Sequence, residues 1–138
     1  MRSIDCRLSC NYIYSKHIGL AFQIVDDILD ITGSALSMGK AVGGSDLQAG
    51  TLTLPLLLAA EHNDELRELL DGKSKLKDPQ HVRRALDLCV NHTNAIQQSK
   101  LLAQEYIDKA VAAMLLLKPS VYQSALIRLA EMVLTRQK

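Results

Sequence analysis

The sequence lacks several features that mark particular classes of protein. Its formal net charge is only +1, so long-range attraction to nucleic acid or to an acidic membrane surface is not indicated. No apolar run approaches the roughly 18 residues that a membrane-spanning helix needs, and the first residues, MRSIDCRLSC, lack the apolar core of a secretory signal. We therefore expect no nucleic-acid partner, no transmembrane segment and an intracellular protein, cytoplasmic or, in a eukaryote, mitochondrial.

Cysteine and histidine are sparse and poorly placed for metal binding. The cysteines are Cys6, Cys10 and Cys89, an odd number without a C-x-x-C pair, which favours reduced thiols in an intracellular protein. The histidines are scattered along the chain without an i, i+4 pair. A zinc site is therefore not expected.

Strand-like alternation of apolar and polar residues is also absent, and the patterns favour helices throughout. The first expected helix runs from about Ser9 to Thr32, the second starts at Thr53 within LTLPLLLAAEH, and the third runs from Asn63 or Asp64 to Gly72. The other three run from Asp78 to about Asn91, from Asn94 to Leu117 and from Ser120 to Arg136. A glycine-rich polar segment follows the first of them, and KSKLK is expected to be a solvated loop. The fold class predicted is all-α, a helical bundle.

The two C-terminal helices have apolar faces that can be read from spacing. Apolar or small residues recur every three or four positions along the long helix, at Ile96, Ser99, Ala103, Tyr106, Ala110, Met114 and Leu117. In the last helix, the residues expected to face inward are Val121, Ala125, Leu129, Met132 and Val133. On the long helix, Tyr106 and Met114 are expected to lie in the core or at a subunit interface.

The stretch GLAFQIVDDILD, Gly19 to Asp30, places three carboxylates in a helix that is otherwise mostly apolar. At about 100° per residue, Gln23, Asp26 and Asp30 fall within about 60° of one another, and Asp27 lies at about 100° from Asp26. The aliphatic residues that fill the opposite arc are Leu20, Ala21, Ile24, Val25, Ile28 and Leu29. The helix is expected to be buried on most sides and to present an acidic stripe to a polar cavity.

The acidic stripe has no nearby basic residue to balance it, since no Lys or Arg occurs between Lys16 and Lys40. Two carboxylates about 6 Å apart repel by roughly 3 kcal/mol at an effective dielectric constant of about 20. A hard divalent cation removes this repulsion, and Mg²⁺ typically binds through one or two carboxylates together with waters and substrate phosphates. The stripe is therefore either a Mg²⁺-bridged phosphate site or a solvated acidic face.

Lys40 follows the acidic stripe within the glycine-rich segment GKAVGGSDLQAG. A lysine in such a segment can contact a phosphate as a point charge. The alternative is an ordinary surface lysine.

These residues resemble a known family. Phe22 to Asp30, FQIVDDILD, is similar to the second aspartate-rich motif of the trans-polyprenyl diphosphate synthases. Gly39-Lys40, Ser45-Asp46-Leu47 and Thr53-Leu54-Pro55 resemble elements that follow this motif. The combination of F-Q-x-x-D-D-x-x-D with a downstream Gly-Lys is more specific than D-D-x-x-D alone. The resemblance covers residues from about Tyr14 to the end and implies the C-terminal half of an isoprenoid-synthase-type helical bundle.

The resemblance implies an enzyme, a prenyltransferase of isoprenoid biosynthesis that condenses isopentenyl diphosphate with an allylic prenyl diphosphate. Catalysis in such an enzyme consists of Mg²⁺-assisted loss of the allylic diphosphate, positioning of the two substrates and exclusion of water. Carried over to this chain, Asp26 is a direct Mg²⁺ ligand, and Asp27 and Asp30 act largely through metal-bound water. These three are the expected catalytic and metal-binding residues.

The same resemblance implies roles for three substrate-binding residues. Gln23 would form a hydrogen bond near the diphosphate, Lys40 would contact it, and Phe22 would stack near the prenyl or isopentenyl group. The expected partners are the two diphosphate substrates and further synthase chains, in a homo- or hetero-oligomer.

The chain also departs from the family pattern. It has one D-D-x-x-D motif, whereas the family's catalytic unit has two on facing helices, so we expect a C-terminal portion that is inactive alone. No element of the resemblance can be placed in residues 1–13, so we expect an unplaced N-terminal segment before the synthase part, 14–138. Thr51 stands where many members of the family have a second lysine, which favours a long-chain product with a quinone side chain as one use. The role of Asp46 stays open. The alternative function is a non-catalytic helical subunit that binds Mg²⁺-diphosphate or a partner synthase.

Overall fold

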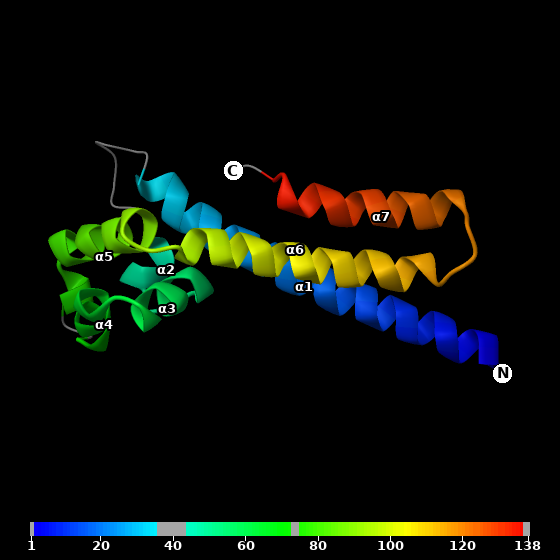
Figure 1. The fold of residues 1–138 in the computed structure, drawn as a ribbon, viewed down its shortest axis with the longest axis horizontal. Helices are drawn as coiled ribbons and strands as arrows, with labels where there is room; N and C mark the ends of the chain where they lie inside the picture. The colour runs from blue at the N-terminus through cyan, green and yellow to red at the C-terminus, as the bar shows by residue number, and fades with distance from the viewer. Residues whose placement is uncertain (1, 36–43, 73–74, 137–138) are drawn as a thin grey trace. The chain divides into compact units, whose positions relative to one another are not determined.

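The computed structural model describes residues 2–35, 44–72 and 75–136. Every regular element in these ranges is a helix, so the all-α prediction is confirmed. The helices are α1 (Arg2–Ala35), α2 (Ser45–Gln48), α3 (Leu54–Glu61), α4 (Asp64–Asp71), the 3-10 turn η1 (Lys75–Lys77), α5 (Pro79–Asn91), α6 (Ala95–Leu115) and α7 (Val121–Leu134). Figure 1 shows their order along the chain. None of the helices in the described part is long and apolar enough to cross a membrane.

The expected helix starts are confirmed by their capping groups. The Asn63 side chain accepts a hydrogen bond from the amide of Leu66 (2.9 Å), and Asp78 accepts one from the amide of Gln80 (2.8 Å), with Pro79 as the first helical residue. Ser120 caps α7 in the same way. Such caps satisfy amides that have no partner within the helix.

Three segments differ from the sequence-based expectation. The first helix begins at Arg2 instead of about Ser9 and ends at Ala35 instead of Thr32. The glycine-rich segment contains a short helix, α2, and KSKLK contains a 3-10 turn. Leu76 in that turn is buried, which anchors a segment that was expected to be a solvated loop. A single buried leucine carries no periodicity, so the pattern could not reveal it.

The chain divides into two compact units, with the boundary inside α1. The first unit comprises Met1–Val25 and Lys100–Gln137, and the second comprises Asp26–Ser99. Each unit is described by itself below.

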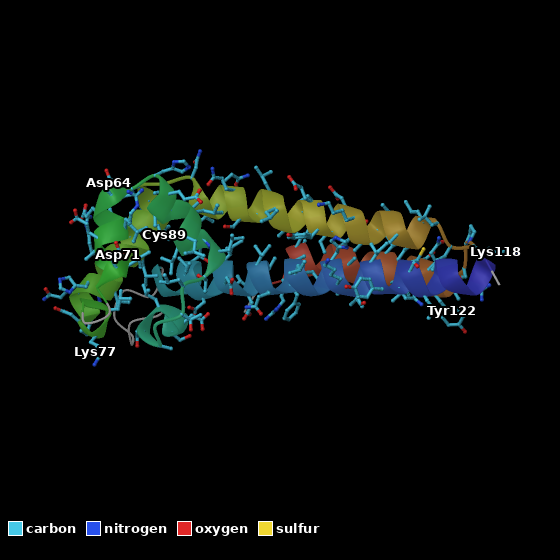
Figure 2. The ribbon with its side chains drawn as sticks, turned by 90° about the horizontal axis from the view of Figure 1, so that it is seen from below. Asp64, Asp71, Lys77, Cys89, Lys118 and Tyr122 are labelled. Atoms are coloured by element: carbon cyan, nitrogen blue, oxygen red, sulfur yellow. The ribbon has the colours of Figure 1, made fainter. Side chains whose placement is uncertain are left out.

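The first unit consists of three helical segments in mutual contact. The hydroxyl of Tyr14 in α1 donates to the carbonyl of Leu126 in α7 (2.8 Å), and burial raises the pKa of Tyr14. The rings of His17 in α1 and Tyr106 in α6 lie 5.7 Å apart. Figure 1 shows α6 and α7 running antiparallel, and the turn that joins them lies near Lys118 and Tyr122 in Figure 2.

The inward face of α6 follows the predicted spacing. Ala103, Ala110 and Met114 are fully buried in this unit. Small side chains at two of these three positions allow neighbouring helices to approach closely. Tyr106 and Leu117 are half-buried. The predicted α6 face is therefore confirmed in this unit.

The predicted inward face of α7 is wrong except at one residue. Val133 is buried, but Val121 is 77% exposed, Leu129 52% and Met132 59%, and Ala125 is exposed as well. The buried face instead carries Gln123, Ala130 and Val133. α7 has apolar residues on more than one side, so its pattern alone does not specify which side packs against the chain.

The hydrogen bonds of Gln123 account for which side of α7 is buried. Its side-chain amide donates to the carbonyl of Met114 (2.8 Å) and to that of Leu117 (3.0 Å), at the end of α6. The last carbonyls of a helix have no partner within the helix. Gln123 therefore caps α6 from the neighbouring helix and directs its own side of α7 inward.

We expect Gln123→Met to lower the free energy of unfolding by about 1–3 kcal/mol, because the Leu117 carbonyl loses the donor that Gln123 supplies and the Met114 carbonyl keeps only the bond from the amide of Leu117. Gln104→Met is the matched control. Gln104 is exposed on α6 and donates to Asp108, four residues further along the same helix, so its change is expected within about 0.5 kcal/mol. Urea unfolding followed by circular dichroism measures both, and equal effects would contradict the capping role.

The second unit has its own apolar core between α3, α4, α5 and η1. Its fully buried members are, among others, Ile31, Leu47, Leu56, Leu66, Val82, Leu88 and Cys89. The Cys89 thiol donates to the carbonyl of Pro55 (3.5 Å) and lies among the helices of this unit in Figure 2. Burial raises the pKa of Cys89 to about 12, so it is a protonated, unreactive thiol at neutral pH.

Candidate functional site

The candidate motif lies on α1, where the local sequence favours an uninterrupted helix. Ala21, Ile24, Val25 and Ile28 are buried, as the helical spacing predicted. Leu20 differs, since it is 38% exposed. The unit boundary falls between Val25 and Asp26, so the aromatic and amide residues of the motif belong to the first unit and its carboxylates to the second.

The three carboxylates differ in their surroundings within the second unit. Asp27 is only 7% exposed, whereas Asp26 and Asp30 are half-buried. Asp30 accepts a hydrogen bond from the hydroxyl of Ser45 (3.1 Å), the first residue of α2. Ser45 belongs to a predicted motif, but its contact with Asp30 was not predicted.

The donor atoms of these residues fit a hard divalent cation. Carboxylate oxygens are ligands that Mg²⁺ and Ca²⁺ prefer, and Mg²⁺ usually keeps several waters and takes phosphate oxygens as well. Within residues 2–35, 44–72 and 75–136, no three or more His, Cys, Asp or Glu side chains form a group that could hold a metal by themselves. The oxygens of Asp26, Asp27 and Asp30 are therefore the type of donor that such a cation prefers, but these three side chains do not form a metal-holding group by themselves.

The aromatic part of the motif is contacted by the C-terminal end of the chain. Phe22 is 45% exposed, and the guanidinium carbon of Arg136 lies 4.0 Å from the centre of its ring. This geometry is a cation–π interaction. Gln23 is exposed. Arg136 could not be predicted as a neighbour of Phe22, because the sequence pattern does not relate residues so far apart.

The remaining motif residues lie at different places in the chain. Lys40 lies outside the described residues. Asp46 and Leu47 belong to α2, and Leu47 is buried. Thr53 precedes α3 with Pro55 in the first turn, as expected, but its side chain makes no capping bond. Its buried hydroxyl oxygen has no hydrogen-bond partner among the residues that the structure describes.

Arg84 on α5 is paired with acidic side chains of α4 and α5. Arg84 donates to both carboxylate oxygens of Glu65 (2.7 and 2.9 Å) and to Asp87 (3.1 Å). The bond from Arg84 lowers the pKa of Glu65, and a hydrogen bond from Asn91 is the main cause of the lowered pKa of Asp87. Arg84 therefore belongs to an exposed ion-pair network.

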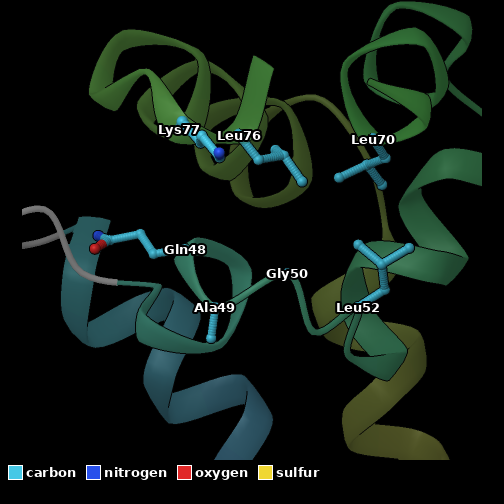
Figure 3. Close-up of a pocket in the computed structure, with 7 residues that line it drawn as sticks. All are labelled: Gln48, Ala49, Gly50, Leu52, Leu70, Leu76 and Lys77. Atoms are coloured by element: carbon cyan, nitrogen blue, oxygen red, sulfur yellow. The ribbon is translucent and has the colours of Figure 1, made fainter. Parts of the chain in front are cut away.

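A separate cavity of about 370 Å³ lies in the second unit (Figure 3). Leu52, Leu70 and Leu76 form much of its wall, and Lys77 lies beside Leu76. α2 and the turn after it supply the remaining wall, from Gln48 to Gly50. None of the described residues that line this cavity is a predicted site residue.

The comparisons with known proteins identify the family. A model of the polyprenyl synthetase family matches residues 7–90. The chain belongs to this family, and the all-α fold and the aspartate-rich helix are those that the resemblance implied.

Relatives with curated names are synthases and transferases of prenyl groups. The chain is 40% identical over 127 residues to the all trans-polyprenyl-diphosphate synthase PDSS1 of Mus musculus, covering 92% of this chain and 30% of that protein. It is 41% identical over 125 residues to the prenyl transferase of Cyanophora paradoxa, covering 91% and 38%. The chain therefore spans roughly a third of these relatives.

Solved structures agree with this assignment. The apo form of an Arabidopsis medium/long-chain length prenyl pyrophosphate synthase has a TM-score of 0.82 and 37% identity, covering 96% of this chain and 45% of that one. A polyprenyl synthase from Caulobacter crescentus, complexed with calcium and isoprenyl diphosphate, has a TM-score of 0.78 and 32% identity, covering 94% and 40%.

Proposed function

We propose that this chain is part of a prenyltransferase that condenses isopentenyl diphosphate with an allylic prenyl diphosphate to give a trans-polyprenyl diphosphate. The observation that carries the proposal is FQIVDDILD on α1, within the segment that matches the polyprenyl synthetase family. Among the relatives is a probable hexaprenyl pyrophosphate synthase, mitochondrial, of Neurospora crassa. This similarity supports a long-chain product, with a quinone side chain as one use, and an intracellular location, mitochondrial in a eukaryote or otherwise cytoplasmic.

In this proposal the carboxylates bind Mg²⁺ and thereby the allylic diphosphate. Mg²⁺, when bound, supplies the positive charge that favours departure of the diphosphate. Asp26 is half-buried and would be the direct ligand. Asp27 and Asp30 would hold metal-bound waters, and burial of Asp27 favours a fixed orientation of its side chain.

The substrate-binding roles belong to Phe22, Gln23 and Lys40. Phe22 is exposed enough to contact a prenyl group. The guanidinium carbon of Arg136 lies 4.0 Å from the centre of the Phe22 ring, so Arg136 contacts the same side chain. Gln23 is exposed and can donate to a diphosphate oxygen. Lys40 would contribute a positive charge to the same diphosphate.

We further propose that the chain acts together with additional synthase polypeptide, in a homo- or hetero-oligomer. The α7 stripe, defined as Val121, Leu129 and Met132, is apolar and more than half exposed at each residue. Exposed apolar stripes of this kind are typical of association surfaces. The stripe also favours the alternative function, a non-catalytic helical subunit that binds Mg²⁺-diphosphate or a partner synthase.

A segment exchange tests the function. We expect the chain alone to incorporate no radiolabelled isopentenyl diphosphate into longer prenyl products. We expect incorporation when the chain replaces the matching segment of the Arabidopsis prenyl pyrophosphate synthase, and loss of incorporation when EDTA removes Mg²⁺. Turnover by the chain alone would contradict the expected inactivity, and a folded chimaera without turnover would favour the non-catalytic alternative.

A further inference from the structure

Ser45 makes a contact with the acidic motif that joins two separate helices of the second unit. Its hydroxyl donates to Oδ1 of Asp30 over 3.1 Å. Ser45 begins α2, and Asp30 lies near the end of α1. We propose that Ser45 is a positioning residue, which holds the Asp30 carboxylate in the orientation that binds Mg²⁺-diphosphate. The inference rests on the proposed function and adds a residue to the site.

The position of Ser45 is fixed from its N-terminal side by Gly44. Gly44 adopts φ +75° and ψ +49°, in the left-handed region, which side chains other than glycine rarely tolerate. A Cβ atom at this position would lie 3.1 Å from Cδ1 of Leu86 in α5. The backbone therefore approaches α5 closely, and the chain turns so that the next residue, Ser45, meets α1.

The position of Ser45 is also fixed from its C-terminal side. The amide of Ala49 donates to the carbonyl of Ser45 (3.0 Å), and the amide of Thr51 donates to the carbonyl of Asp46 (2.8 Å). Leu47 between them is 1% exposed and belongs to the same core as Leu86. A serine held by a closed turn and a buried leucine loses little further freedom when it binds Asp30.

A hydrogen bond from a positioned hydroxyl restricts the rotamer of a carboxylate and favours its charged form. Removing a partner that orients a metal ligand in this way typically lowers metal affinity by about 10- to 100-fold. The Ser45 side chain is exposed, so we expect the lower end of this range. The contact also makes α2 and the acidic end of α1 depend on each other before any ligand binds.

The test compares Ser45→Ala, Ser45→Thr and Asp30→Ala with the wild-type chain. Ser124→Ala is the matched control, because Ser124 is exposed on α7 in the other unit. Calorimetry measures binding of geranyl diphosphate in the presence of Mg²⁺. We expect binding roughly 10-fold weaker for Ser45→Ala, near wild type for Ser45→Thr, which keeps the hydroxyl, and unchanged for Ser124→Ala.

Hydrogen exchange of the free chain gives a readout that does not depend on activity or ligand. We expect the amides of Gln48 and Ala49 in the α2 turn to exchange faster in both Ser45→Ala and Asp30→Ala. We also expect Ser45→Ala to have no further effect on binding when Asp30 is already alanine, because the two act through one contact.

The outcomes separate this inference from the proposed function. Wild-type binding without any loss in Ser45→Ala overturns the positioning role while the proposed function stands. Faster exchange in Ser45→Ala with unchanged binding means that the contact is only structural, and this also overturns it. If the wild-type chain binds no geranyl diphosphate with Mg²⁺, this inference is overturned, whereas the proposed function is decided by the segment exchange.

Discussion

Asp26→Ala is expected to weaken binding of Mg²⁺-geranyl diphosphate by more than about 100-fold, because even residues that only orient metal ligands contribute about 10- to 100-fold. Isothermal titration calorimetry on the chain measures this loss directly. In the Arabidopsis chimaera, we expect the same substitution to reduce incorporation of isopentenyl diphosphate at least as strongly. The physical reason is that the departing diphosphate would lose the cation that offsets its charge.

Asp71→Ala is the matched control for this prediction. Asp71 is an exposed aspartate in the same unit, and it is the last residue of α4. A negative charge is unfavourable at the C-terminal end of a helix, so its removal is not expected to destabilise the chain. A loss of binding of equal size in both variants would indicate a general effect of charge and would contradict a site at Asp26.

Leu56→Ala is expected to lower the free energy of unfolding by about 2–5 kcal/mol, because it removes a fully buried side chain and leaves a cavity. Leu56 is 1% exposed in the core of the second unit. Urea unfolding followed by circular dichroism measures the change.

The adjacent Leu57 provides the control on the same helix. It is 47% exposed, so Leu57→Ala is expected to change the free energy of unfolding by only about 0.5 kcal/mol. Equal destabilisation by both substitutions would mean that Leu57 is covered in solution, for example by another chain. The pair therefore tests the orientation of α3, which an apolar run such as LPLLLAA leaves undefined.

The candidate motif could be predicted because its information is local. Helical spacing relates Gln23, Asp26 and Asp30 whatever the rest of the fold, and the lack of nearby basic residues points to a cation. The capping residues of α4, α5 and α7 were predictable for the same reason, since a cap acts within one helical turn.

The contacts of that motif could not be predicted. Ser45 meets Asp30 across a glycine-rich segment whose path depends on Gly44 lying against Leu86. Arg136 meets Phe22 from the other end of the chain. Both pairs are set by how helices pack together, which spacing along one segment does not record.

α7 illustrates the same limit in the hydrophobic pattern. Its spacing suggested that Val121, Leu129 and Met132 face inward, yet Gln123 directs the opposite side toward α6 by bonding to two carbonyls. A polar residue that satisfies buried carbonyls can outweigh an apolar stripe, because unsatisfied buried groups cost about 1–3 kcal/mol each.

The sequence by itself determined that the chain is helical, where most helices start, and which helix carries the acidic motif, because periodicity, caps and charge act over a few residues. Only the tertiary structure decided that Ser45 orients Asp30, that Arg136 stacks on Phe22 and which side of α7 is buried. These arrangements depend on close packing and hydrogen bonds between segments distant in the chain, and each is decided by the combined fit of several helices.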